Sequence, residues 1–172
     1  MLKEEIKNEL LLQHNNFVEV IKSIPADKVH QSKDGKWSPA QQLDHIYKSV
    51  SPVRLAFSFP KFLLKMIYGT ANRQSRTYDT LLQRYHEKLQ AGGKSTAPFI
   101  PSVKNTSVDL PLSKLKLLIV SLCSKVDTYS EIQLDTFILP HPLLGKLTLR
   151  EMLYFTIYHV QHHQKQIENS IQ

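Results

Sequence analysis

The sequence predicts an all-α fold, a bundle of four long helices with shorter helical pieces between them. Apolar residues recur at helical spacing through four long segments, and proline, glycine and serine collect in the connectors that separate these segments. Strand-like patterning is confined to short fragments such as residues 136–139. With 172 residues, of which 41% are hydrophobic and 22% charged, the chain has the size and composition of a single globular domain covering residues 1–172.

The first two long helices have recognisable ends. Residues 2–23 carry apolar side chains at helical spacing, and Pro25 follows them as a stop signal. The second helix begins where Ser38 can cap the first turn, Pro39 suits the first helical position and Gln41 can complete a capping box. Two prolines further along should bend or end this helix, Pro52 and Pro60.

Two shorter helices are expected next. Residues 60–68 are apolar with Lys61 and Lys65 interleaved, a pattern that could form a short amphipathic surface helix or a helix that contacts a membrane. We favour packing of this segment against the core over both alternatives. Residues 79–90 form a second short helix, and a loop with two glycines follows at residues 91–98.

The last two long helices complete the predicted bundle. Pro111 precedes the third long helix, in which Cys123 is expected to be a buried small apolar residue rather than a nucleophile. A connector over residues 139–147 leads to the last helix. This helix begins at Thr148, which can form a capping box with Glu151.

Charge and composition exclude several classes of partner. The net charge is +7 and the isoelectric point is near 9.4, but the basic residues are scattered rather than clustered, so we expect a solvated surface and no specific nucleic-acid partner. No apolar run approaches the ~18 residues of a spanning helix, so no membrane partner is expected. A single cysteine and the lack of a secretory signal predict a cytoplasmic location.

Three of the eight histidines fall in one short segment, His159, His162 and His163. Side chains at i and i+4 lie on one face of a helix, so His159 and His163 could share a metal ion. On a helical wheel of ~100° per residue, His163 lies about 40° and His159 about 80° from the centre of the apolar stripe, whereas His162, at about 140°, points toward solvent. Two alternatives stay open, metal binding or ordinary hydrogen bonds of buried imidazoles.

A third ligand has to come from another helix. His45, in the second helix, is the best-placed candidate, although it lies off the apolar stripe of that helix. His14, His30 and His86 are expected at the surface. His141 lies between two prolines, and we expect a turn residue there in preference to a residue at the mouth of a pocket.

Several motifs, in this order, resemble the DinB-like superfamily. They are Trp-Ser-Pro at residues 37–39, Leu-Asp-His-Ile at 43–46, His-Pro-Leu-Leu-Gly-Lys-Leu-Thr at 141–148, and the closing H-x-x-x-H-x-x-Q pattern within 159–167. The resemblance covers residues 37–167. It implies an up-down-down-up four-helix bundle and a divalent metal, zinc or nickel, held by three histidines. Carried over by position, the ligands are His45, His159 and His163.

The resemblance also implies a range of activities. Similar proteins include transferases that use a low-molecular-weight thiol, and we expect a thiol S-transferase of this kind, with a small-molecule substrate and the thiol as a second cofactor. The alternatives are a metal-dependent hydrolase, or a non-enzymatic stress protein in which the metal only ties helices together. A homodimer is an open option.

Further residues are candidates for supporting roles. Four polar side chains could orient the ligand imidazoles, Asp44, Thr156, Tyr158 and Gln166. The loop over residues 91–110 is a candidate lid, in which Lys94 and Lys104 could attract an anionic thiol.

Overall fold

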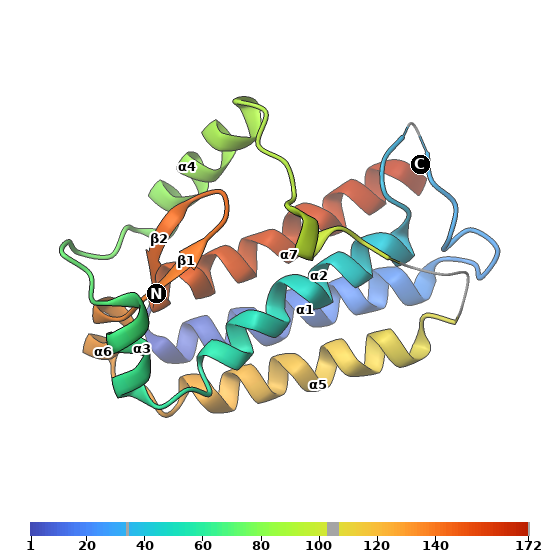
Figure 1. The fold of residues 1–172 in the computed structure, drawn as a ribbon. Coiled ribbons are helices and arrows are strands. Elements are labelled where there is room, and N and C mark those ends of the chain that lie inside the picture. Colours follow the sequence, from blue (N-terminus) through green and yellow to red (C-terminus); the bar gives the residue numbers. More distant parts are fainter. Residues whose placement is uncertain (34, 103–106, 172) are drawn as a thin grey trace.

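The computed structural model describes residues 1–33, 35–102 and 107–171 of the chain. Four long helices form its bundle, α1 (Lys3–Ser23), α2 (Pro39–Ala56), α5 (Asp109–Val126) and α7 (Leu149–Ile171). In Figure 1, α1 and α7 run in one direction and α2 and α5 in the opposite direction, so the order along the chain is up, down, down, up. The predicted fold class is therefore confirmed. No helix in the described part of the chain combines the length and apolar character needed to cross a bilayer.

Shorter elements connect and cover the bundle. They are α3 (Lys61–Tyr68), α4 (Tyr78–Gln90), the 3₁₀ helix η1 (Ala97–Phe99), α6 (Glu131–Thr136) and the strands β1 (Ile138–His141) and β2 (Gly145–Thr148). Helix α4 and the two strands lie on the same side of α7 in Figure 1, and η1 contacts α2, while α3 and α6 lie at the end of the bundle where α7 begins. The site described below is formed between the bundle and the first of these groups.

The helix starts agree with the predicted caps. The hydroxyl of Ser38 accepts a hydrogen bond from the backbone of Gln41, and the side chain of Gln41 accepts one from the backbone of Ser38. Thr148 and Glu151 form the same reciprocal pair at the start of α7. Helix α2 continues past Pro52 to Ala56, so this proline does not end it.

The connector over residues 139–147 is a β-hairpin rather than irregular chain. Strands β1 and β2 pair antiparallel, with Ile138 opposite Thr148 and His141 opposite Gly145. Gly145 has a φ of +77°, a left-handed conformation that other residues adopt at a cost, and this allows the sharp return of the chain. From the sequence, strand character was expected only in short fragments such as residues 136–139, because two prolines and a glycine obscure the pairing pattern.

Helix α3 departs from the predicted packing. Only Leu64 is buried, whereas Phe62, Met66 and Ile67 have exposed fractions of 68%, 72% and 54%. The expectation that this segment packs into the core is thus wrong for most of its apolar side chains. With eight residues the helix has only about two turns, and only one of its faces lies against the bundle, so few of its side chains can be buried.

A buried ion pair fixes the beginning of α7. The side chain of Glu151 is inaccessible to solvent, and it accepts two hydrogen bonds from the Arg73 guanidinium, at 2.6 and 2.7 Å, and one from the backbone of Arg76, at 2.7 Å. Burial alone would raise the pKa of Glu151, but these donors together bring it below its usual value. The carboxylate therefore joins the segment before α4 to the first turn of α7.

Candidate metal centre

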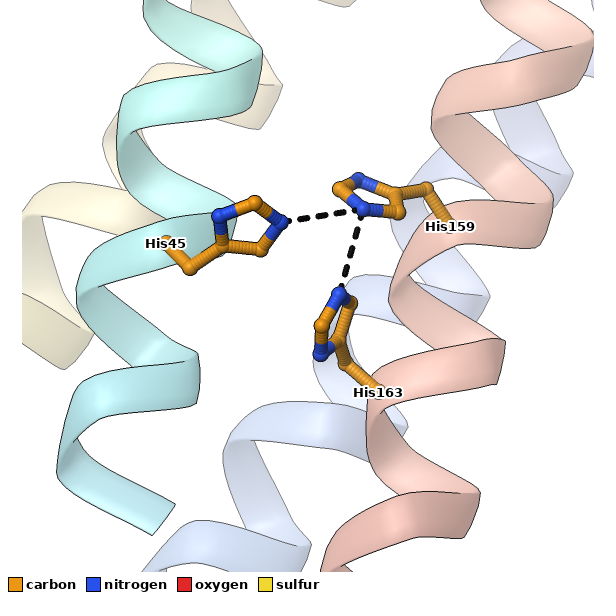
Figure 2. A group of neighbouring side chains, drawn as sticks. All are labelled: His45, His159 and His163. Carbon is orange, nitrogen blue, oxygen red and sulfur yellow. Dashed lines mark hydrogen bonds between the residues drawn. The ribbon is translucent and has the colours of Figure 1, made fainter. Parts of the chain in front are cut away.

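Three buried imidazoles from two antiparallel helices point at one another (Figure 2). His45 extends from α2, and His159 and His163 extend from successive turns of α7. The Nε2 atom of His159 lies 3.1 Å from Nε2 of His45 and 3.1 Å from Nε2 of His163. The structure thus brings together the three residues that the resemblance nominated.

The orientation of the His45 ring is fixed by a backbone carbonyl. Its Nδ1 lies 2.7 Å from the carbonyl oxygen of Phe99, at the end of η1. Because a carbonyl can only accept, Nδ1 must carry the proton and donate. In the neutral ring Nε2 is then unprotonated, and its lone pair faces His159.

The His163 ring is oriented in the same way by a buried side chain. Nδ1 of His163 lies 3.0 Å from Oε1 of Gln42, and Nε2 of Gln42 donates to the carbonyl oxygen of Trp37 at 3.1 Å. The second bond fixes which end of the amide faces the histidine, so Nδ1 of His163 donates to Oε1. Nε2 of His163 is left as an acceptor facing His159.

Hydrogen bonds among the described residues cannot satisfy this cluster. Even if Nε2 of His159 carries the proton of its ring, that single proton serves one neighbour, and the lone pair of the other Nε2 has no donor. A buried acceptor without a partner is costly, whereas a cation would satisfy all three lone pairs. Nitrogens placed tetrahedrally at ~2.05 Å from zinc lie ~3.3 Å apart. Two of the separations here are 3.1 Å, and the ligand atoms of all three residues lie within 4.8 Å of one another. The residues therefore fit a divalent ion.

Burial keeps the three rings neutral. It lowers the pKa of His159 and of His163 well below 6.5, and the neighbouring imidazoles lower both further. Burial also lowers the pKa of His45, against the opposing effect of its bond to Phe99. Metal ligation requires neutral imidazole, so the environment favours the form that binds an ion at neutral pH.

A cavity of about 370 Å³ opens beside the three histidines. Most of its wall is apolar and aromatic, with contributions from Trp37, Tyr85, Phe99, Leu139, Met152 and Phe155. Polar groups enter from the loop after α4, where Lys94, Ser95 and Thr96 reach the wall. The volume and lining suit a small, mainly apolar molecule.

Other histidine predictions were partly wrong. His14 is 2% exposed rather than at the surface, because it lies on the inner face of α1 and donates from Nδ1 to the carbonyl of Leu10. His162 does not simply point to solvent, since it is half-buried in the cavity wall with its ring 6.0 Å from that of Tyr85. Elements outside the bundle cover it, and a wheel of one helix cannot show them. His86 is exposed as predicted.

The expected supporting residues have other roles. Gln166 contacts His162, Asp44 accepts from the backbone of Ser102, and Tyr158 contacts His86. Thr156 donates to the carbonyl of Met152, within its own helix. In the candidate lid, Lys94 and Phe99 line the cavity, whereas Lys104 lies outside the described residues.

Gln42 is the supporting residue that the sequence interpretation missed. It lies at helical spacing from Ile46, Val50 and Val53, so it is a polar residue on the apolar stripe of α2. A buried amide in such a position needs a hydrogen-bond partner, and this requirement was the available signal. The aromatic ring of Trp37, also missed, lies 4.8 Å from that of His45.

The comparisons with known proteins agree with this architecture. Residues 9–167 match the sequence profile of the DinB superfamily. A similar solved structure is that of YfiT from Bacillus subtilis, described as a probable metal-dependent hydrolase with an unusual four-helix bundle topology. The two structures align with a TM-score of 0.62 over 97% of this chain and 84% of the YfiT chain, at 18% sequence identity. No curated protein sequence matches the chain significantly.

Proposed function

The chain belongs to the DinB superfamily, and from this premise we propose that it is a divalent-metal-dependent enzyme acting on a small, largely apolar molecule. His45, His159 and His163 hold the ion in this proposal, and the adjacent cavity holds the substrate. The observation that carries it is the convergence of three neutral Nε2 atoms at the edge of a cavity. A single metal ion would meet both the ligands and the substrate.

The protein's own contribution is to hold the ligand atoms in place. Phe99 and Gln42 keep the protons of His45 and His163 on Nδ1, so both Nε2 atoms stay free to coordinate. Phe155 stacks on His159 with ring centroids 4.8 Å apart, which limits rotation of that imidazole. The apolar wall excludes much of the water that would compete with a substrate.

Three neutral ligands leave the full charge of a divalent ion uncompensated, and such an ion lowers the pKa of a water or thiol that it coordinates. Two nucleophiles are therefore compatible with the site. Thiol transfer is our first candidate, and Lys94 supports it because the lysine offers a cation in the cavity wall for an anionic thiol. Hydrolysis is the second, and the description of YfiT as a probable metal-dependent hydrolase favours it.

The cavity favours these enzymatic alternatives over a metal with a purely structural role. Structural zinc sites are usually closed by four protein ligands. Among the described residues only three histidine, cysteine, aspartate or glutamate side chains converge here, and all three line the cavity. A position is thus left for a ligand that comes from outside the protein.

Metal analysis of single variants tests the ligand set. We expect about one zinc or nickel ion per chain in the wild type and a loss of most of it in His45→Ala, His159→Ala and His163→Ala. His162→Ala is the matched control, because it removes an imidazole from the same helix and the same cavity without removing a ligand. Metal retained in all three ligand variants would refute the proposed centre.

A second assay distinguishes the two chemistries. 4-Nitrophenyl acetate reports hydrolysis, and 1-chloro-2,4-dinitrobenzene with glutathione, bacillithiol or mycothiol reports thiol transfer. Turnover of either that requires added metal and falls at least a hundredfold in His159→Ala supports an enzyme, and identifies which chemistry it performs. Metal binding without turnover in both assays, combined with a lower melting temperature after chelation, would favour the structural alternative.

A further inference from the structure

We propose that His141 supplies a hydrogen-bond donor to the cavity, and that it selects ligands with a carbonyl oxygen on an otherwise apolar body. The inference rests on the proposed function only in treating this cavity as the substrate site. His141 belongs to neither helix that carries the candidate metal ligands, since it ends β1 at the turn of the hairpin.

The hairpin turn determines which nitrogen of His141 carries the proton. Nδ1 lies 3.1 Å from the backbone nitrogen of Leu143 and 3.1 Å from that of Leu144. Both backbone groups can only donate, so Nδ1 accepts from both and cannot be protonated. The neutral ring must therefore carry its proton on Nε2, which becomes a donor. Both nitrogens of the ring are in this way assigned by the backbone.

The Nε2–H group has no acceptor within the described part of the protein. No hydrogen bond to this atom is formed by any described residue, and His141 is one of the residues that line the cavity. Burial lowers the pKa of His141 to about 4. The ring is therefore neutral at neutral pH and carries one N–H group, on Nε2. A ligand in the cavity is the natural source of an acceptor.

Aromatic packing places this donor near the candidate metal centre. The His141 ring meets the Phe155 ring edge-on at a centroid distance of 4.2 Å, and Phe155 stacks on His159 at 4.8 Å. The His141 ring is consequently within about 9 Å of the His159 ring. One small molecule in the cavity can reach both groups.

The chemistry of the wall defines the class of ligand. A neutral N–H donor pairs with a carbonyl oxygen without the desolvation cost that a charged group would add. The surrounding rings of Tyr85, Phe99 and Phe155 accommodate an apolar body. We therefore expect a ketone, ester or amide with an aromatic or branched apolar group, bound with its oxygen on Nε2 of His141.

Two variants of His141 separate the role of Nδ1 in the hairpin turn from the role of Nε2–H as a donor. In His141→Asn, the amide oxygen replaces Nδ1 as the acceptor for the Leu143 and Leu144 backbones, and the Nε2–H donor is lost. In His141→Gln, the amide NH₂ lies near the former Nε2 position and keeps a donor in the cavity. His86→Asn is the control, because it changes an exposed histidine in the same way.

Acetophenone and α-methylstyrene are the probes, since they share a shape and differ in that a CH₂ group replaces the carbonyl oxygen. We expect the wild type and His86→Asn to bind acetophenone at least about fivefold more tightly than α-methylstyrene, the effect of one net hydrogen bond. His141→Asn should lose this preference and His141→Gln should keep part of it. Equal preference in the wild type and His141→Asn would overturn the proposal.

Nitrogen NMR of the wild type, labelled at histidine, gives a readout that no variant can disturb. His141 should show an unprotonated Nδ1 and a protonated Nε2, whose proton shifts downfield with acetophenone and not with α-methylstyrene. An unprotonated Nε2, or equal shifts with both probes, would refute the assignment. Repeating the titration after chelation distinguishes this proposal from the metal centre, because the donor preference should survive removal of the ion.

Discussion

Replacing His14 with leucine should make the protein more stable in mild acid. His14 is 2% exposed, its Nδ1 donates to the Leu10 carbonyl, and its Nε2 is buried without a partner. Burial lowers the pKa of His14 to about 4, from an ordinary value of 6.5. The folded state therefore resists a proton that the unfolded state accepts, and stability is lost as the pH falls from 6.5 toward 4.

The size of the effect follows from the two pKa values. The complete shift of about 2.5 units corresponds to ~3.4 kcal/mol, and the part expressed at pH 5 is ~2 kcal/mol. At pH 7.5 this destabilisation is close to zero, because His14 is neutral in both the folded and the unfolded state. His14→Leu should thus gain ~2 kcal/mol over the wild type between pH 7.5 and pH 5, or roughly 4–8 °C in melting temperature for a domain of this size.

Urea denaturation at both pH values, with the same chelator present, measures this difference. Chelation removes any metal ion from both proteins, so metal binding adds nothing to the difference in the free energy of unfolding. The other buried histidines are present in both proteins, so their contributions to this difference cancel. His86→Leu is the control, since it removes an exposed imidazole by the same substitution. A gain below ~0.5 kcal/mol would refute the reasoning, because it would mean that water or a rearrangement stabilises protonated His14 in the folded core.

Three further predictions concern the groups around the site. Gln42→Leu removes the acceptor that orients His163 and should weaken metal binding about 10- to 100-fold in a chelator competition. Gln166→Leu should not, because the Gln166 amide bonds to His162 and not to a candidate ligand. Glu151→Gln should lower the free energy of unfolding by ~3 kcal/mol because the Arg73 guanidinium loses its buried carboxylate, while Glu131→Gln, in a half-exposed pair with Arg150, should cost under ~1 kcal/mol. Gly93→Ala would place a methyl group 2.6 Å from Leu143 Cδ1 and 2.7 Å from the Lys88 carbonyl oxygen, and should cost ~1–3 kcal/mol by denaturation; unchanged stability would contradict that packing.

The sequence was most informative where a property is local. Ser38 and Thr148 cap helices through side chains that accept hydrogen bonds from backbone groups within four residues. These helix starts could therefore be predicted from a short stretch of sequence. The spacing of His159 and His163 is local in the same sense, and their proximity follows from the helix itself. Joining them to His45 depended on the resemblance, because the relative placement of α2 and α7 is a property of the whole bundle.

The burial of a side chain by elements far away in the sequence could not be predicted from such short stretches. A helical wheel treats every direction away from the apolar stripe as solvent, and it therefore placed His162 outside. Tyr85 on α4 and the cavity wall occupy that direction in the folded protein. His141 illustrates the same point, since its value as a donor depends on a hairpin whose two strands were hidden by prolines in the connector.

The same short segments that close the cavity also direct the candidate ligands. Phe99 lines the cavity, and its carbonyl oxygen accepts the hydrogen bond from Nδ1 of His45. A ligand that displaces the Phe99 ring would therefore alter the hydrogen bond that orients one of the three imidazoles, and metal affinity would depend on whether the cavity is filled. Reciprocity then requires that the ion change ligand affinity by the same factor, so acetophenone binding measured with and without zinc gives the coupling directly. A ratio of one would mean that the Phe99 carbonyl stays fixed while its side chain adapts, and that the backbone of η1, rather than the ring, sets the direction of His45.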